Sequence, residues 1–128
     1  MARRRITSGS PFEATFGYAR AVVVADRVFV SGTAPIMADG AAPPTDAHGQ
    51  ARRCLQIIQA ALEEAGGGPA DVVRTRVYLV DRADFDEVAR AHGEVFADVR
   101  PASTAVVVAG LLDPRWRVEI EADAILSR

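Results

Sequence analysis

The sequence contains a single cysteine, no long apolar stretch and no excess of positive charge. Because Cys54 is the only cysteine, an internal disulfide is impossible, and its place in a helical apolar pattern indicates a packed thiol. The basic run at residues 3–5 is followed by Ile6-Thr7-Ser8, so we expect neither a signal peptide nor a membrane anchor. These features favour a cytoplasmic protein.

The charge balance argues against nucleic acid as a partner. A formal net charge of −2 at pH 7 and a pI near 5.6 supply no field that would steer the chain toward a polyanion. The sequence also has no Walker loop, nucleotide fingerprint, zinc-binding pattern or Ser-x-x-Lys motif, so we expect no metal and no cofactor. The partners that remain are small molecules and other copies of this chain.

What is present is the composition of a folded domain. The 128 residues are 49% apolar and 25% charged, close to the average of globular proteins. A chain of this size buries enough surface to hold a core without disulfides or metals. We therefore expect one domain over residues 1–128.

Apolar periodicity predicts two helices and five strands. Strands are expected at residues 21–24, 28–31, 72–80, 103–108 and 117–126, where apolar residues cluster or alternate. Ala25-Asp26-Arg27 suits a three-residue hairpin between the first two strands. One helix is expected at residues 46–65, and a second begins at Asp84, which has capping-box spacing to Glu87, and ends before residues 98–101. The pattern does not decide whether residues 4–7 form a further strand.

This order of elements predicts an α+β sandwich in which two helices cover one face of a sheet. One face of the last strand should carry Val118, Ile120, Ala122, Ala124 and Leu126. One face of strand 72–80 should carry Val73, Thr75, Val77 and Leu79. The other face of the sheet would hold Tyr78 among charged and apolar residues, and association with other subunits would cover it.

Two segments at strand ends have the residues of a binding site. They are Ser31-Gly32-Thr33-Ala34-Pro35 and Arg100-Pro101-Ala102-Ser103-Thr104. A glycine near a proline at a strand exit lets backbone N–H groups face a cavity, where they can hold a carboxylate. A purely structural turn explains the same residues.

Three carboxylates, Glu119, Glu121 and Asp123, share one face of the last strand, where like charges repel unless they are paired or solvated. One solution is ion pairing across neighbouring strands, for which the sequence offers Arg74, Arg76 and Arg117. The other is that one carboxylate lines a pocket as a proton acceptor.

The two histidines have no metal-ligand partners at useful spacing. His92 lies four residues after Val88, on the apolar side of the second helix. We interpret His92 as a partly buried structural residue.

Over nearly its whole length the sequence resembles the YjgF/RidA family, also labelled endoribonuclease L-PSP. The features that carry the resemblance occur in the expected order: Gly17-Tyr18, Ser31-Gly32-Thr33-Ala34-Pro35, Gln50-Ala51-Arg52 and Val118-Glu119-Ile120-Glu121-Ala122. The resemblance implies a chorismate-mutase-like α+β fold with one mixed sheet packed against two helices. It also implies a homotrimer with a central barrel-like core and ligand clefts between subunits.

The resemblance further implies the activity of a reactive intermediate deaminase, which hydrolyses enamines and imines to 2-oxo acids and ammonia. Tyr18 and Glu119 match the pocket tyrosine and the water-activating glutamate of the family. Active members place an arginine directly after Pro-Ala in the closing signature, where it grips the substrate carboxylate with two hydrogen bonds.

In this chain that position is Ser103. A hydroxyl donates one hydrogen bond and carries no charge, so its substitution for arginine costs on the order of a few kcal/mol in carboxylate binding. Either the ligand is neutral or less acidic, or another arginine takes over the role, of which Arg100 is the nearest. Trp116 and Arg115, next to the Asp113-Pro114 turn, could also reshape the cleft.

We therefore expect Glu119 as the catalytic residue and a ligand site built from Tyr18, Ser31, Gly32, Thr33, Arg100, Ser103, Thr104 and Trp116. Three functions compete. The first is a hydrolase of imines with weak activity toward the family's usual substrates, and the second is a non-catalytic, metabolite-binding or regulatory trimer. Ribonuclease activity ranks last, because the chain lacks both a basic surface and a suitably placed pair of histidines.

Overall fold

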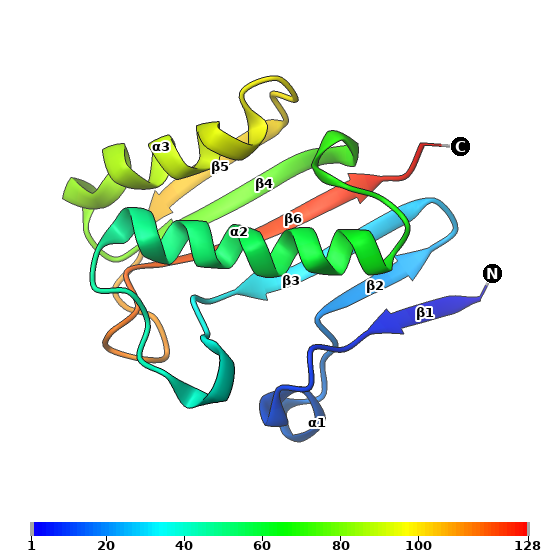
Figure 1. Cartoon of the computed structure of the whole chain (residues 1–128), viewed down its shortest axis with the longest axis horizontal. Coiled ribbons are helices and arrows are strands. Elements are labelled where there is room, and N and C mark those ends of the chain that lie inside the picture. The colour runs from blue at the N-terminus through cyan, green and yellow to red at the C-terminus, as the bar shows by residue number, and fades with distance from the viewer. Residues whose placement is uncertain (1, 128) are drawn as a thin grey trace.

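The computed structural model describes residues 2–127, whose strands form one six-stranded mixed sheet (Figure 1). The strand order is β1-β2-β3-β6-β4-β5, and neighbouring strands are antiparallel except for the parallel pair β4 and β5. The strands are β1 (Arg3–Ile6), β2 (Ala21–Val24), β3 (Arg27–Thr33), β4 (Val72–Leu79), β5 (Ala102–Val107) and β6 (Val118–Ile125).

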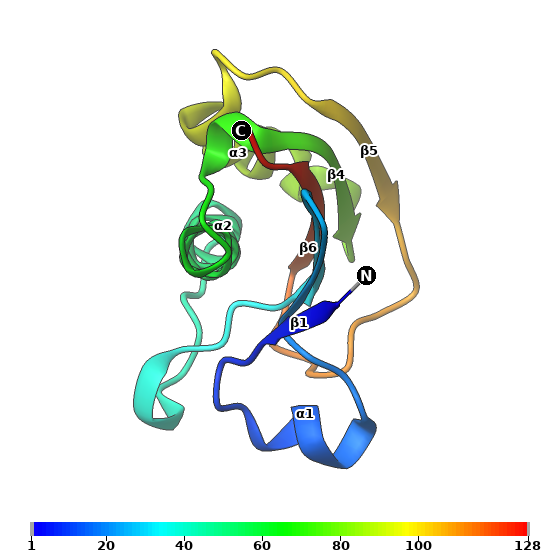
Figure 2. The same cartoon turned by 90° about the vertical axis from the view of Figure 1, so that its right-hand side faces the viewer.

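Two long helices, α2 (Ala47–Glu64) and α3 (Phe85–Phe96), cover the same face of this sheet (Figure 2). Shorter helical segments join the strands: α1 (Pro11–Phe16) and the 3-10 turns η1 (Ala38–Gly40), η2 (Pro69–Asp71) and η3 (Arg82–Asp84). The described part of the chain includes no helix long and apolar enough to cross a membrane. The α+β architecture predicted from the sequence is confirmed.

The core lies between the sheet and α2, as the periodicity predicts. Asp46 caps the first turn of α2 by accepting a hydrogen bond from the Gly49 amide at 2.9 Å. Leu55 and Ile58 on this helix are fully buried, and truncating either to alanine would cost about 2–5 kcal/mol. The predicted inward face of β6 is buried from Val118 to Ala124.

Strand β4 departs from strict alternation at its start. The pairing with β6 shifts register between Val72 and Arg74, so that Val72 is buried and Val73 is exposed. The prediction that Val73 shares the inward face is therefore wrong. From Thr75 onward the predicted alternation holds, with Thr75 fully buried.

Two local predictions need correction. Val24 pairs with Arg27, so the hairpin between β2 and β3 has a two-residue turn with Ala25 at φ 55°, in place of the predicted three residues. Asp84 makes no capping hydrogen bond at the start of α3, because its carboxylate accepts from the Arg117 guanidinium instead, at 3.1 Å to each oxygen. The sequence did not decide whether residues 4–7 form a strand, and the structure has a strand there, β1.

Helix α1 was not predicted, although its ends carry recognisable signals. Ser10 accepts a hydrogen bond from the Phe12 amide, and Pro11 occupies the first turn. Gly17 then ends the helix at φ 94°, in the left-handed region that glycine adopts readily. The helix turns the chain so that Tyr18 and Arg20 arrive at the edge of β3.

Within residues 2–127, neither long helix lies on the second face of the sheet (Figure 2). Phe29 and Ile125 are exposed on this face, and every residue of β5 is exposed as well. Val106 on β5 is 42% exposed beside Tyr78 of β4. An edge strand and an apolar face left open in this way are surfaces that proteins usually cover.

Candidate functional site

The residues expected to form one site lie on opposite faces of the sheet. Glu119 sits between Val118 and Ile120, which are buried against the helices, so its side chain points to the open face. Ser103 lies on the helix-covered face, where its hydroxyl bonds to the buried Thr75. One chain therefore does not bring Ser103 and Glu119 together.

The first group of site residues, here called the Glu119 cluster, comprises Tyr18, Arg20, Gly32 and Glu119. Gly32 lies where the pairing of β3 with β6 shifts register, and a β-carbon on this residue would lie 2.5 Å from Glu119 Oε2. The carboxylate thus packs directly against the glycine backbone. A register shift of this kind re-aims the groups around it.

Arg20 connects the other members of the Glu119 cluster, although the sequence did not predict it as a site residue. Its guanidinium donates to the Gly32 carbonyl oxygen at 2.5 Å and lies 5.7 Å from the centre of the Tyr18 ring. The residue is only 4% exposed, and its Nε atom has no partner among the described residues. A buried guanidinium with a free donor is uncommon.

Opposing effects set the protonation of Glu119. Burial raises the pKa of its carboxyl above the ordinary value, the positive charge of Arg20 lowers it, and the nearby Glu121 raises it further. Burial is the largest of the three, so the net shift is upward. A carboxyl of raised pKa is a better proton acceptor than an ordinary surface carboxylate.

The hydroxyls of Ser31 and Thr33 are engaged by the backbone. Ser31 Oγ donates to the Ala19 carbonyl at 2.7 Å, and Thr33 Oγ1 donates to the Ser31 carbonyl at 2.7 Å. Thr33 is fully buried, whereas Gly32 is exposed. Of the predicted Ser31–Pro35 segment, Gly32 is therefore the residue that the structure places at the Glu119 cluster.

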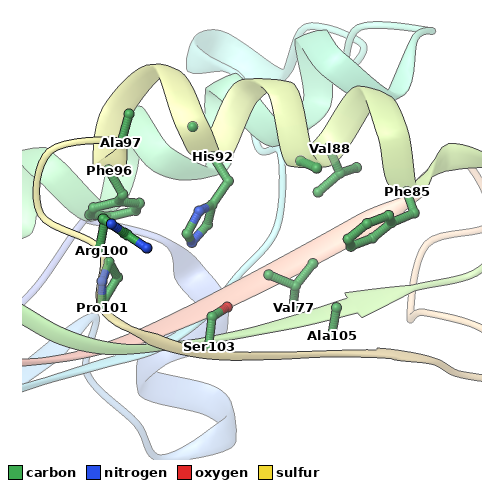
Figure 3. A pocket seen from close by; sticks show the side chains of 12 residues that line it. Val77, Phe85, Val88, His92, Phe96, Ala97, Arg100, Pro101, Ser103 and Ala105 are labelled. Atoms are coloured by element: carbon green, nitrogen blue, oxygen red, sulfur yellow. The ribbon is translucent and has the colours of Figure 1, made fainter.

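The second group lines a hollow of about 270 Å³ between α3 and β5, here called the Ser103 pocket (Figure 3). Ser103, His92 and Arg100 are its polar members. The remaining walls are apolar or glycine: Val77, Phe85, Val88, Ala89, Gly93, Phe96, Ala97, Pro101 and Ala105. The exposed Phe85 and Ala89 of α3 face this pocket, which accounts for the apolar residues on that side of the predicted helix.

Arg100 lies at the Ser103 pocket, as expected for a residue three positions away. It is exposed and adopts φ 54°, a left-handed conformation that is strained for a side-chain-bearing residue. Its amide donates to the Phe96 carbonyl at 2.8 Å and closes α3. The pocket thus has a guanidinium on its wall, but at a different position from the arginine of the family pattern.

Two other predicted ligand residues lie elsewhere. Thr104 follows Ser103 in a strand and therefore points to the opposite face. Trp116 lines a different hollow of about 460 Å³ that includes Asp81, Asp84 and Arg117. The structure does not bring Trp116 to either the Glu119 cluster or the Ser103 pocket.

Ion pairing accounts for only part of the acidic face of β6. Arg76 Nη1 lies 3.4 Å from Asp123 Oδ2. Tyr78 donates its hydroxyl to Glu121, and this hydrogen bond is the main cause that raises the pKa of the tyrosine. Among the described residues, Glu119 has neither an ion-pair partner nor a hydrogen-bond donor. This agrees with the hypothesis that one of the three carboxylates lines a pocket as a proton acceptor.

The remaining chemistry-bearing residues are packed. Cys54 is fully buried, and burial raises the pKa of its thiol, which agrees with the predicted packed cysteine. Within residues 2–127 no three potential metal ligands of the His, Cys, Asp and Glu types gather at one place. His92 is half-buried, as predicted, and its Nε2 lies 2.8 Å from Thr75 Oγ1. Its ring lies tilted against the Phe96 ring with 4.7 Å between centres.

The sheet order, the shared helix face and a glutamate packed on a glycine of β3 define a small α+β protein with two separate groups of candidate site residues. Residues 8–126 match the family described as Endoribonuclease L-PSP. The chain therefore belongs to this family, also known as YjgF/RidA.

Relatives and solved structures agree with this assignment. The chain is 43% identical to the protein SCO2049 of Streptomyces coelicolor over 121 residues, 94% of this chain and 90% of that protein. It is 34% identical over 104 residues to 3-aminoacrylate deaminase RutC of Acinetobacter baylyi, 80% of this chain and 82% of the relative. The crystal structure of Rv2704 from Mycobacterium tuberculosis, a YjgF/YER057c/UK114 family member, superposes with a TM-score of 0.89 at 40% identity, covering 98% and 100% of the two chains.

Proposed function

We propose that this protein is a homotrimeric, deaminase-like hydrolase that binds a small metabolite in clefts between its subunits. The observation that carries the proposal is the placement of Glu119 and the Ser103 pocket on opposite faces of one sheet. If a second copy lays its Glu119 cluster against the Ser103 pocket of the first, the two halves form one site. Association of this kind would also cover the exposed strand β5.

In the proposed reaction, Glu119 accepts a proton from a water molecule as that water attacks the carbon of a C=N bond. That proton passes to the nitrogen and gives a carbinolamine. The hydroxyl proton of the carbinolamine then moves to the nitrogen as the C–N bond breaks, so ammonia leaves and a carbonyl forms. An enamine first takes up a proton at carbon and loses one from nitrogen to become the imine. Two observations support this assignment: the raised pKa of Glu119, and the Arg20 guanidinium beside it, which donates to the Gly32 carbonyl.

The relatives support the same reaction class. The Acinetobacter baylyi relative is named as a deaminase of 3-aminoacrylate, which is an enamine. Ser103 in place of the family's arginine predicts that this chain acts weakly on small carboxylate-bearing imines. As expected from the sequence, we propose no nucleic-acid or membrane partner and a cytoplasmic location.

The competing function is a metabolite-binding or regulatory trimer without catalysis. Ser103 favours it, because its neutral hydroxyl is bonded to Thr75 and cannot hold a carboxylate with two charged hydrogen bonds. In this alternative Glu119 serves binding alone.

One experiment separates the two functions. The protein is incubated with imines generated from several amino acids, and the oxo products are trapped with semicarbazide while ammonia is followed. The hydrolase predicts turnover that falls at least a hundredfold in Glu119→Gln, an effect typical of the loss of a general base. The control Glu63→Gln changes an exposed helix residue and should leave the rate unchanged. Binding without turnover by the wild type would support the non-catalytic trimer.

A further inference from the structure

A chain of hydrogen bonds runs from α3 through β4 to Ser103 of β5, which lines the Ser103 pocket. His92 Nε2 lies 2.8 Å from Thr75 Oγ1, and Thr75 Oγ1 donates to Ser103 Oγ at 2.8 Å. His92 and Ser103 point toward one another across the pocket (Figure 3). Thr75 is fully buried between them, so its hydroxyl cannot exchange these partners for water.

With Thr75 assigned as the donor to Ser103, the remaining hydrogens of this chain follow. A hydroxyl carries one hydrogen, and Thr75 uses it toward Ser103. Thr75 must then accept from His92, so Nε2 of the imidazole carries the ring proton. Ser103 has accepted a hydrogen bond and keeps its own hydrogen, for which the structure gives no acceptor among residues 2–127. That hydrogen is available to a ligand in the pocket.

The walls of the pocket decide which acceptor suits this donor. They are mostly apolar, and removing an anion from water into such surroundings is costly unless a charged partner accompanies it. Arg100 is a cation on this wall, and because its side chain is exposed, water weakens its attraction for an anion. A neutral carbonyl oxygen is satisfied by a single donated hydrogen bond and carries no such cost.

We propose that the Ser103 pocket selects ligands whose hydrogen-bonding group is an uncharged carbonyl, such as an amide, with Ser103 as the donor held in place by Thr75 and His92. This inference rests on the proposed function and narrows its substrate class from imino acids to neutral imino amides. Water would then convert such an imine into a 2-oxo amide and ammonia. His92 and Thr75 are positioning residues, because they act through Ser103.

The test uses two probes that differ in charge and little in shape, 2-oxobutyramide and 2-oxobutyrate, titrated into the full-length protein by calorimetry. The wild type should bind the amide at least tenfold more tightly than the acid. Ser103→Ala should weaken amide binding at least fivefold, consistent with a lost hydrogen bond, and Ser103→Thr should restore it. His92→Phe keeps the aromatic contact with Phe96 and should weaken amide binding without altering the fold.

The Arg100→Ala variant tests the opposing hypothesis, in which Arg100 holds the carboxylate of a charged ligand. If the acid binds more tightly than the amide, and this preference disappears in Arg100→Ala, then Arg100 is the carboxylate clamp and the inference is overturned. Amide binding that is unchanged in a folded Ser103→Ala variant, or no binding of either probe, overturns it as well. A preference for the amide without turnover would support the inference and contradict the hydrolase. Rapid turnover of imino acids would support the hydrolase and contradict the inference.

Discussion

The Glu119 carboxylate packs so closely on Gly32 that a single added methyl group at residue 32 would lie 2.5 Å from Oε2. The atom in the way is the end of a flexible side chain, so Gly32→Ala should displace the carboxylate at little cost in stability. We expect the rate of imine hydrolysis to fall at least tenfold, since general-base catalysis depends on position. Trapped oxo product and the melting temperature, measured on the same preparation, test this.

Gly110→Ala is the matched control. Its added β-carbon would meet no atom within 4 Å, and activity should be unchanged. Equal rates in Gly32→Ala and Gly110→Ala would contradict the assigned role of Glu119.

Arg20→Met should shift the pH dependence of catalysis. The guanidinium lowers the pKa of Glu119, so its removal raises that pKa. Because the base acts when ionised, the acid limb of kcat/KM should move to higher pH. Rate profiles between pH 4 and pH 8 measure the shift, and Arg27→Met, which alters an exposed arginine of β3, serves as the control. A profile identical to that of the wild type would show that Arg20 is structural only.

Gln50 should be essential to stability despite being polar. Its side chain is buried and bonds to the carbonyls of Pro44 and Arg115 and to the amide of Arg117. Gln50→Leu leaves these backbone groups unpaired, at a cost of about 2–5 kcal/mol in the free energy of unfolding. Urea denaturation measures it, with Gln56→Leu on the exposed side of the same helix as the control. Similar midpoints for the two variants would refute this account of Gln50.

Self-association should depend on the open face of the sheet. We expect a mass in light scattering about three times the 13.6 kDa of one chain. Val106→Asp places a charge on this face and should shift the protein toward monomers, because burying an unpaired carboxylate is costly. Leu112→Asp, at a residue that is 96% exposed, should leave the mass unchanged. A monomeric wild type at micromolar concentration would count against the shared site.

Local patterns in the sequence were enough to predict the sheet faces and the helix stripes. The buried positions of β6 and α2 follow from spacing alone, because every second strand residue and every third or fourth helix residue meets the same layer. Val73 broke the pattern because its direction depends on a register shift against a strand far along the chain. No local signal reports such a shift.

The candidate site was predicted in part for the same reason. Gly32 and Glu119 were identified as residues, but their contact arises from pairing between β3 and β6. Arg20 was missed because an arginine is normally exposed, and its burial follows from a carbonyl and an aromatic ring supplied by the fold. Trp116 was expected near the ligand, yet its loop faces a different hollow.

The measurement that tests the central claim most directly is the hydrolysis of 2-aminoacrylate by the wild type, Ser103→Arg, and Ser103→Arg with Glu119→Gln. If the site is complete apart from the carboxylate clamp, restoring the guanidinium should raise kcat/KM by roughly tenfold or more, and the added Glu119→Gln change should abolish the gain. A Ser103→Arg variant that stays folded and associated but gains neither rate nor affinity for 2-oxo acids would contradict the claim. Wild-type hydrolysis as fast as that of an arginine-bearing relative would contradict it equally.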